Sequence, residues 1–130
     1  MNKYLAKIIA SDQEGLQMIS ACSSAARVKI SDIKYLASNK VFLLSIERIK
    51  VENENENKKV NSVLRFDFVD KVRSKHIDQS KKEAVLDLVG IDYLKNNDVY
   101  EINLIFNNNA YIALTTEIIE ARLEDQSEIK

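Results

Sequence analysis

Basic side chains recur at every second position near the middle of the chain, at Lys71, Arg73 and Lys75. On a β-strand they would project from one face about 6.6–7 Å apart, close to the phosphate repeat of a nucleic-acid strand. The same row could hold a single anion, with Arg65 on the same face. The spacing predicts an anion- or nucleic-acid-binding surface. Asp67 and the lack of interleaved aromatic residues favour a solvated outer face instead.

The residues directly after this row form a second candidate for chemistry. His76, the one histidine of the chain, could exchange a proton beside the carboxylate of Asp78. A hydrogen-bonded or exposed histidine at a strand end is the simpler interpretation. One histidine and one cysteine are too few soft ligands for a zinc site, so we expect no metal and no cofactor. Cys22 falls on the apolar stripe of an expected helix, which favours a buried structural thiol.

The strand that carries the basic row must be bent. Residues 60–78 alternate apolar and polar side chains, as a strand does, but fully extended they would span roughly 60 Å. We expect a bend or bulge at 69–70, where Asp70 falls on the apolar face. The apolar side chains before the bend predict a core shared with the rest of the sheet: Leu64, Phe66, Phe68, Leu16, Ile19, Phe42, Leu44, Ile102, Leu104 and Phe106.

One helix is expected near the N-terminus. Residues 11–14 read as a capping box in which Ser11 is the N-cap, and apolar side chains at helical spacing predict a helix over 12–26. The period then changes to two. It predicts further strands over residues 4–10, 28–35, 41–51, 84–95 with a slip near Gly90, and a hairpin over 99–116 that turns at 107–109.

Three segments carry weaker signals. Residues 117–123 fit a strand that continues from the hairpin, which we favour, or a short helix. Residues 52–59 are polar and repetitive and predict a mobile loop, and residues 126–130 are expected to fray. Proline is absent and glycine occurs twice, so asparagine is expected to supply the turns.

The elements predict an α+β fold. About seven strands with short connections imply an antiparallel meander about 30 Å wide, which one helix about 10 Å across cannot cover. The sheet must therefore curl into a partly open barrel or roll packed against the N-terminal helix. The length of 130 residues predicts a single domain over residues 1–130.

Charge and cysteine content restrict the partners and the compartment. A formal charge of −1 gives no overall field that attracts nucleic acid or an anionic membrane. One cysteine cannot form an internal disulfide, and we expect no signal peptide and no membrane span. We expect a cytoplasmic protein without a membrane partner.

Four segments resemble a small bacterial family catalogued as domain of unknown function 2948. They are residues 8–21, 28–36, 65–78 and 119–125, and the similarity covers roughly residues 4–125. The chain has His76 where the family usually has Gly, and Ala37 where it usually has Pro. The resemblance implies a single cytoplasmic domain and brings no established activity.

These observations predict a non-catalytic interaction module that binds a protein partner or itself, with a weak or moderate homodimer through an unpaired sheet edge. The alternative is a weak binder of anions or nucleic acid through Lys71, Arg73 and Lys75. A second alternative is an enzyme of unrecognised type, for which a deep pocket that holds His76 beside a carboxylate would be evidence.

Overall fold

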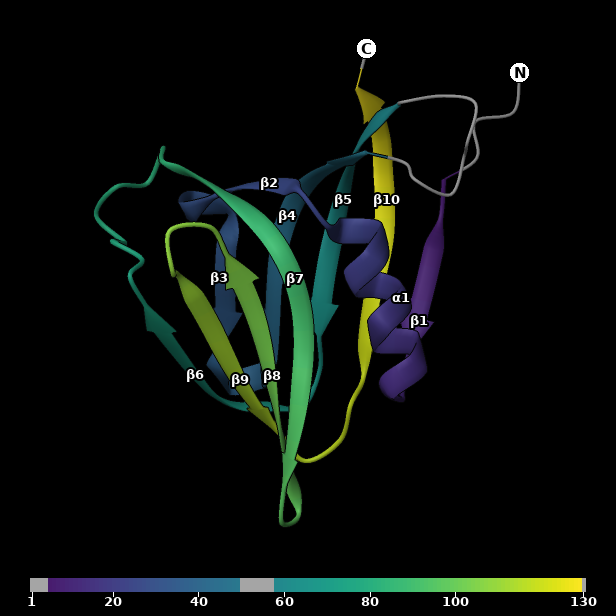
Figure 1. The fold of residues 1–130 in the computed structure, drawn as a ribbon, viewed down its shortest axis with the longest axis vertical. Helices are drawn as coiled ribbons and strands as arrows, with labels where there is room; N and C mark the ends of the chain where they lie inside the picture. The colour runs from purple at the N-terminus through teal and green to yellow at the C-terminus, as the bar shows by residue number, and fades with distance from the viewer. Residues whose placement is uncertain (1–4, 50–57, 130) are drawn as a thin grey trace.

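The computed structural model describes residues 5–49 and 58–129, with the side chain of Glu128 left out of the description. Within these residues, ten strands form one sheet and one α-helix packs against it (Figure 1). The elements in chain order are β1 (Lys7–Ala10), α1 (Gln13–Ser23), β2 (Ala26–Lys29), the 3₁₀ turn η1 (Ile30–Asp32), β3 (Ile33–Leu36), the 3₁₀ turn η2 (Ala37–Asn39), β4 (Val41–Ile49), β5 (Lys59–Phe66), β6 (Val69–Lys75), β7 (Val85–Asn96), β8 (Val99–Phe106), β9 (Tyr111–Thr116) and β10 (Ala121–Ile129).

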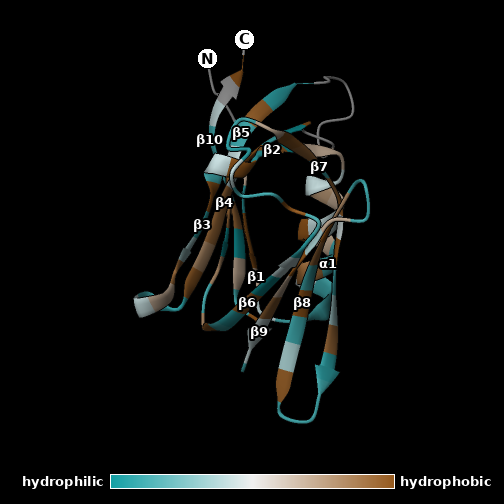
Figure 2. Ribbon diagram, turned by 90° about the vertical axis from the view of Figure 1, so that its left-hand side faces the viewer, coloured by the Kyte–Doolittle hydropathy of each residue, from teal (hydrophilic) through white to brown (hydrophobic). Residues whose placement is uncertain are grey.

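The sheet is antiparallel and curled but does not close into a barrel. Its strand order is β1-β10-β5-β4-β2-β7-β8-β9-β6, and β3 pairs with β4 beside this path. Figure 2 shows the side on which the sheet is open, with β3 at the left and β6 to its right. The predicted α+β fold with a partly open roll is confirmed, with ten strands in place of about seven.

The opening begins where the chain loses one of its two neighbours, since β2 pairs with both β4 and β7 and β3, within the described residues, pairs with β4 alone. Residues 28–35, expected as one strand, are divided by η1: β2 pairs with β7 over its whole length, whereas β3 pairs with β4. The sheet therefore forks at η1 into two walls. One wall ends at β3, and the other continues through β7, β8 and β9 to β6.

Helix α1 begins one residue later than expected. Asp12, not Ser11, is the N-cap, and its carboxylate accepts a hydrogen bond of 2.8 Å from the backbone N–H of Gly15. Gly15 is required by a close approach, because a Cβ there would lie 2.9 Å from the Cα of Ala10. Leu16 and Ile19 are buried as predicted, where the helix packs against β1 and β7.

The core contains all of the predicted residues except one. Phe66 and Leu64 are buried, but Phe68 is 47% exposed. The chain leaves the sheet at Asp67 and Phe68, between β5 and β6, and the left-handed φ of 59° at Phe68 reverses the expected alternation. The predicted irregularity at 69–70 is present as a bulge between Val69 and Lys71, after this break.

The second half of the chain follows the predicted pattern closely. The hairpin of β8 and β9 has the expected register, with Ile102 opposite Leu114, and β7 has a bulge between Leu88 and Gly90. Residues 117–120 lie outside the strands. The next strand, β10, does not extend the hairpin but inserts between β1 and β5, and its pairing continues to Ile129. Most of the polar 52–59 segment lies outside the described residues, and Lys59 begins β5.

Turns without glycine use other residues in the left-handed conformation. Asn97, Asn108 and Asn109 have φ between 58° and 60°, as expected for asparagine. His76 also has a positive φ, of 62°. None of the helices in the described part of the chain has the length and apolar character needed to cross a membrane.

Candidate functional site

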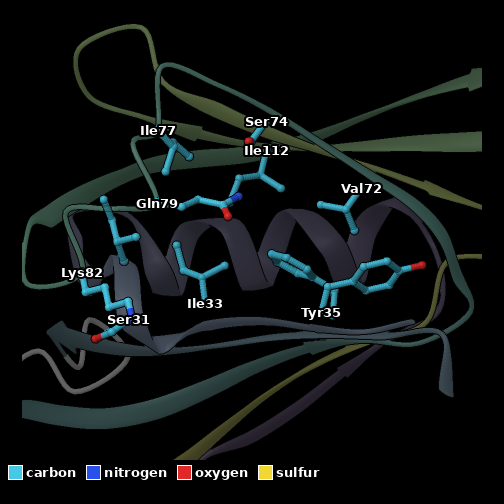
Figure 3. Close-up of a pocket in the computed structure, with 11 residues that line it drawn as sticks. Ser31, Ile33, Tyr35, Val72, Ser74, Ile77, Gln79, Lys82 and Ile112 are labelled. Atoms are coloured by element: carbon cyan, nitrogen blue, oxygen red, sulfur yellow. The ribbon is translucent and has the colours of Figure 1, made fainter. Parts of the chain in front are cut away.

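A cleft of about 460 Å³ lies where the two walls of the sheet fail to meet (Figure 3). This volume is within the range of about 300–1,000 Å³ that is usual for ligand sites. Most of the lining is aliphatic or aromatic, and four polar side chains complete it. The lining residues are Ile30, Ile33, Tyr35, Phe42, Val72, Ile77, Ile112, Ser31, Ser74, Gln79 and Lys82.

Alternation along two edge strands aims these side chains into the cleft. Ile33 and Tyr35 face inward from β3, and Val72 and Ser74 face inward from β6. The walls are not joined by backbone pairing between β3 and β6. Each strand therefore presents an unpaired edge to the cleft, which is the position a further strand would occupy.

One end of the cleft is closed by contacts to the start of β6. The hydroxyl of Tyr35 donates a hydrogen bond of 2.8 Å to the carbonyl of Val69, and the N–H of Val69 donates one of 2.8 Å to the carbonyl of Lys40. Lys40 also pairs with Asp70 at 2.9 Å, and this contact raises the pKa of the Lys40 ammonium group. Because a whole tyrosine side chain spans the gap, β3 and β6 lie further apart than the about 4.8 Å of paired strands.

The other end is closed by the segment between β6 and β7. The N–H of Ile30 donates to the carbonyl of Ala84 at 3.0 Å, and the N–H of Ser31 donates to the carbonyl of Lys82 at 3.0 Å. These bonds hold residues 82–84 against η1. The cleft is therefore fixed at both ends by hydrogen bonds and open along its length.

Four polar groups line the cleft, and no side-chain hydrogen bond joins them to one another within the described residues. Ser31, Gln79 and Lys82 lie toward the same end, and Ser74 lies on the β6 wall (Figure 3). Among the described lining residues there is no carboxylate, imidazole or thiol. Within the described chain no hydrogen bond joins Lys82 to the hydroxyl of Ser31 or Ser74.

The basic row lies beside the cleft, on the outer face of its β6 wall. Lys71, Arg73 and Lys75 are exposed there, and Arg73 contacts Glu101 of β8 at 2.7 Å. Arg65 does not join them. It lies on β5, far from β6 in the strand order, and its guanidinium contacts Asp67 at 3.0 Å.

His76 and Asp78 flank a cleft residue without lining the cleft themselves. Both side chains are exposed, and Ile77 between them faces the cleft. The carboxylate of Asp78 accepts hydrogen bonds from the hydroxyl of Ser80 at 2.6 Å and from its N–H at 3.0 Å. These bonds, the hydroxyl's first, lower the pKa of Asp78 below its ordinary 3.8. This carboxylate therefore stabilises a turn.

A second polar cluster, missed from the sequence, lies inside the fold at the opposite wall. Arg48 of β4 is fully buried with Asp125 of β10. The hydroxyl of Ser62 donates to Asp125 at 2.6 Å, and the N–H of Ala6 donates to it at 2.9 Å. Cys22 is buried nearby as predicted, and its carbonyl accepts from Arg48 at 3.4 Å. The cluster joins four elements and has a structural role.

Metal binding has no preformed site in the described chain. No group of three or more His, Cys, Asp or Glu side chains is placed there to hold an ion. Of the described acids near the cleft, Asp70 pairs with Lys40, and Asp78 accepts hydrogen bonds from Ser80.

The cleft could not be located from the sequence, although one signal was present. Ile33 and Tyr35 alternate with polar residues in a short strand, and Ile77 follows the basic row. What makes them a site is the separation of β3 and β6. That separation depends on the fork at η1 and on the contact between Tyr35 and Val69.

Residues 6–130 match the model of a family described as "Protein of unknown function (DUF2948)". The match covers nearly the whole chain, so the protein belongs to this family. No curated protein and no solved structure matches the chain.

Proposed function

We propose that this DUF2948 protein is a non-catalytic interaction module that binds an extended segment of a protein partner in the cleft between β3 and β6. The observation that carries the proposal is the pair of unpaired strand edges on either side of an apolar cleft. An extended peptide gains main-chain hydrogen bonds from such an edge, and pockets for alternate side chains give specificity.

The dimensions and lining of the cleft support this mode of binding. Its apolar walls can take aliphatic side chains from every second residue of a guest strand. The lining residues of β3 and β6, such as Ile33 and Val72, likewise come from every second position of their strands. The hydrogen bonds at its two ends fix the distance between the walls before binding. The protein therefore loses little conformational entropy when a peptide binds. The absence of a carboxylate, imidazole or thiol from the described lining favours binding over catalysis.

The compartment is part of the proposal. Cys22 is buried and the fold has a large apolar core, so stability does not depend on a disulfide or an oxidising environment. We place the module in the bacterial cytoplasm on this ground and on the family resemblance.

The test begins with an unbiased library of random peptides selected on the folded protein. Enriched peptides are then titrated into isotope-labelled protein, and amide NMR shifts are followed. We expect shifts at the amides of β3, β6, Gln79 and Lys82. A Ser74→Trp variant fills the cleft from an exposed position and should weaken binding by at least about tenfold, roughly 1.4 kcal/mol.

Controls separate the cleft from the rest of the surface. Gln79→Trp fills the cleft from a different segment and covers the case in which Ser74→Trp misfolds. Ser127→Trp places the same side chain on the exposed surface of β10 and should bind as the unmodified protein does. Absence of any enriched peptide, or equal binding by all three variants, would refute the proposal.

A further inference from the structure

The guest strand would place alternate side chains on opposite faces of the sheet. Side chains that point inward would meet Ile33 and Tyr35 of β3 and Val72 of β6, all of which line the cleft. They should therefore be apolar. Side chains that point outward would lie on the outer face, between those of β3 and β6.

The outer face is basic on both sides of the cleft. Lys34 projects outward from β3, because it alternates with the inward residues Ile33 and Tyr35. The basic row of β6 is on the facing wall. Side chains directly opposite on neighbouring strands lie about 4.5–5.5 Å apart, so outward side chains of a guest would have cations on both sides.

These cations are largely unneutralised. Lys34, Lys71 and Lys75 make no ion pair with the described part of the chain. Among nearby acids, Asp70 is paired with Lys40, and Asp78 is hydrogen-bonded to Ser80. The exposed Asp32 precedes Lys34 but is outnumbered by the surrounding lysines.

We infer that the partner segment alternates apolar and acidic residues, the apolar ones entering the cleft and the acidic ones lying between Lys34 and the basic row. This inference rests on the proposed function and names the chemistry of its partner. A nucleic-acid strand would neutralise the same lysines, but its phosphates would leave the apolar cleft unfilled. Arg73, in addition, is already paired with Glu101.

The test compares three capped, fluorescent peptides of about seven residues, the length of an ordinary strand, that alternate Val with Glu, Gln or Lys. Binding is measured by fluorescence anisotropy at low and high salt. We expect the Glu peptide to bind roughly tenfold more tightly than the Gln peptide, for about three favourable cross-strand pairs, and the Lys peptide most weakly. High salt should remove the advantage of Glu, since the charges are exposed.

Charge reversal provides the matched comparison. The Lys71→Glu/Lys75→Glu variant should reverse the preference between the Glu and Lys peptides. The Lys7→Glu/Lys95→Glu variant makes the same change in net charge on β1 and β7 and should keep the original order. Loss of preference in both variants alike would show a general charge effect and overturn the inference.

The outcomes separate this inference from the proposed function. Equal, cleft-dependent binding of the Glu and Gln peptides would overturn the acidic partner and leave the peptide-binding module standing. Failure of all three peptides, together with failure of the library selection, would overturn both. Tighter binding of single-stranded DNA than of the Glu peptide, lost on Lys71→Glu/Lys75→Glu, would overturn the acidic peptide in favour of a nucleic-acid surface.

Discussion

Arg48 and Asp125 form a two-contact salt bridge in the interior of the protein. The Nε atom of Arg48 lies 3.0 Å from one carboxylate oxygen and a terminal guanidinium nitrogen lies 2.9 Å from the other, with both side chains closed to solvent. A charge in this position is tolerated only while its partner is present, because an unpaired buried ion loses its hydration without compensation.

The first prediction is that Asp125→Asn lowers the free energy of unfolding by about 3–5 kcal/mol, since it leaves the Arg48 guanidinium buried without a countercharge. Urea denaturation measures the change. Glu101→Gln, which breaks the exposed pair with Arg73, is the control and should cost less than about 1 kcal/mol. Equal losses in the two variants would mean that Arg48 is solvated.

The second prediction compares two phenylalanines that are two residues apart. Phe66→Ala should cost about 3–5 kcal/mol because Phe66 is fully buried and packs against Phe42 with ring centroids 6.4 Å apart. Phe68→Ala should cost less than about 1 kcal/mol, since Phe68 is 47% exposed. Thermal and chemical unfolding give both values, and a larger loss for Phe68 would contradict the break between β5 and β6.

The third prediction concerns the left-handed residue at the end of β6. His76→Gly should raise the free energy of unfolding by roughly 0.5–1 kcal/mol. Glycine removes the strain of a side chain at positive φ, and this gain exceeds the extra conformational entropy that glycine loses on folding. Lys75→Gly, in the adjacent extended position, should lower it by about 0.5–1 kcal/mol. Peptide binding by the His76→Gly variant should be unchanged; its loss would assign His76 a direct role.

The fourth prediction is a weak homodimer through the edge at β1. The described sheet has free edges at β1, β3 and β6. Those at β3 and β6 face the cleft, and the row of cations on β6 would repel the same row on a second copy. β1 instead exposes Ile9, with 62% of its surface accessible. Light scattering should show a dimer at high concentration that Ile9→Lys abolishes and Ile105→Lys, on β8, does not. A strictly monomeric unmodified protein would refute it.

Local patterns were sufficient to predict most of the elements. The alternation around Ile102 and Leu104, the slip near Gly90 and the asparagine turns depend on neighbours in sequence, and each is present. Phe68 was placed wrongly because nothing in the sequence distinguishes a left-handed phenylalanine from an extended one. The missed Arg48 did carry a signal, since it continues the inward series of Phe42, Leu44 and Ile46 on β4.

The candidate site was less predictable because it is a relationship between distant strands. The basic row was found from its spacing, but its separation from Arg65 follows from the positions of β5 and β6 in the sheet. The cleft depends on where the sheet forks. The fork at η1 is set by which strands pair with β2 and β3, and β7, a partner of β2, is distant from it in the sequence. The anion-binding role of the basic row remains a prediction, which the salt-dependent measurements above address.

The insertion of β10 between β1 and β5 has a consequence for how the protein folds during its synthesis. The N–H of Ala6 donates to Asp125, 119 residues later, so this edge of the sheet cannot form until β10 has left the ribosome. Until then the guanidinium of Arg48 cannot form its ion pair with Asp125, and β5 has an unpaired edge that other nascent chains can bind. Folding of this sheet should therefore be slow, because it waits for a strand far along the chain from its neighbours.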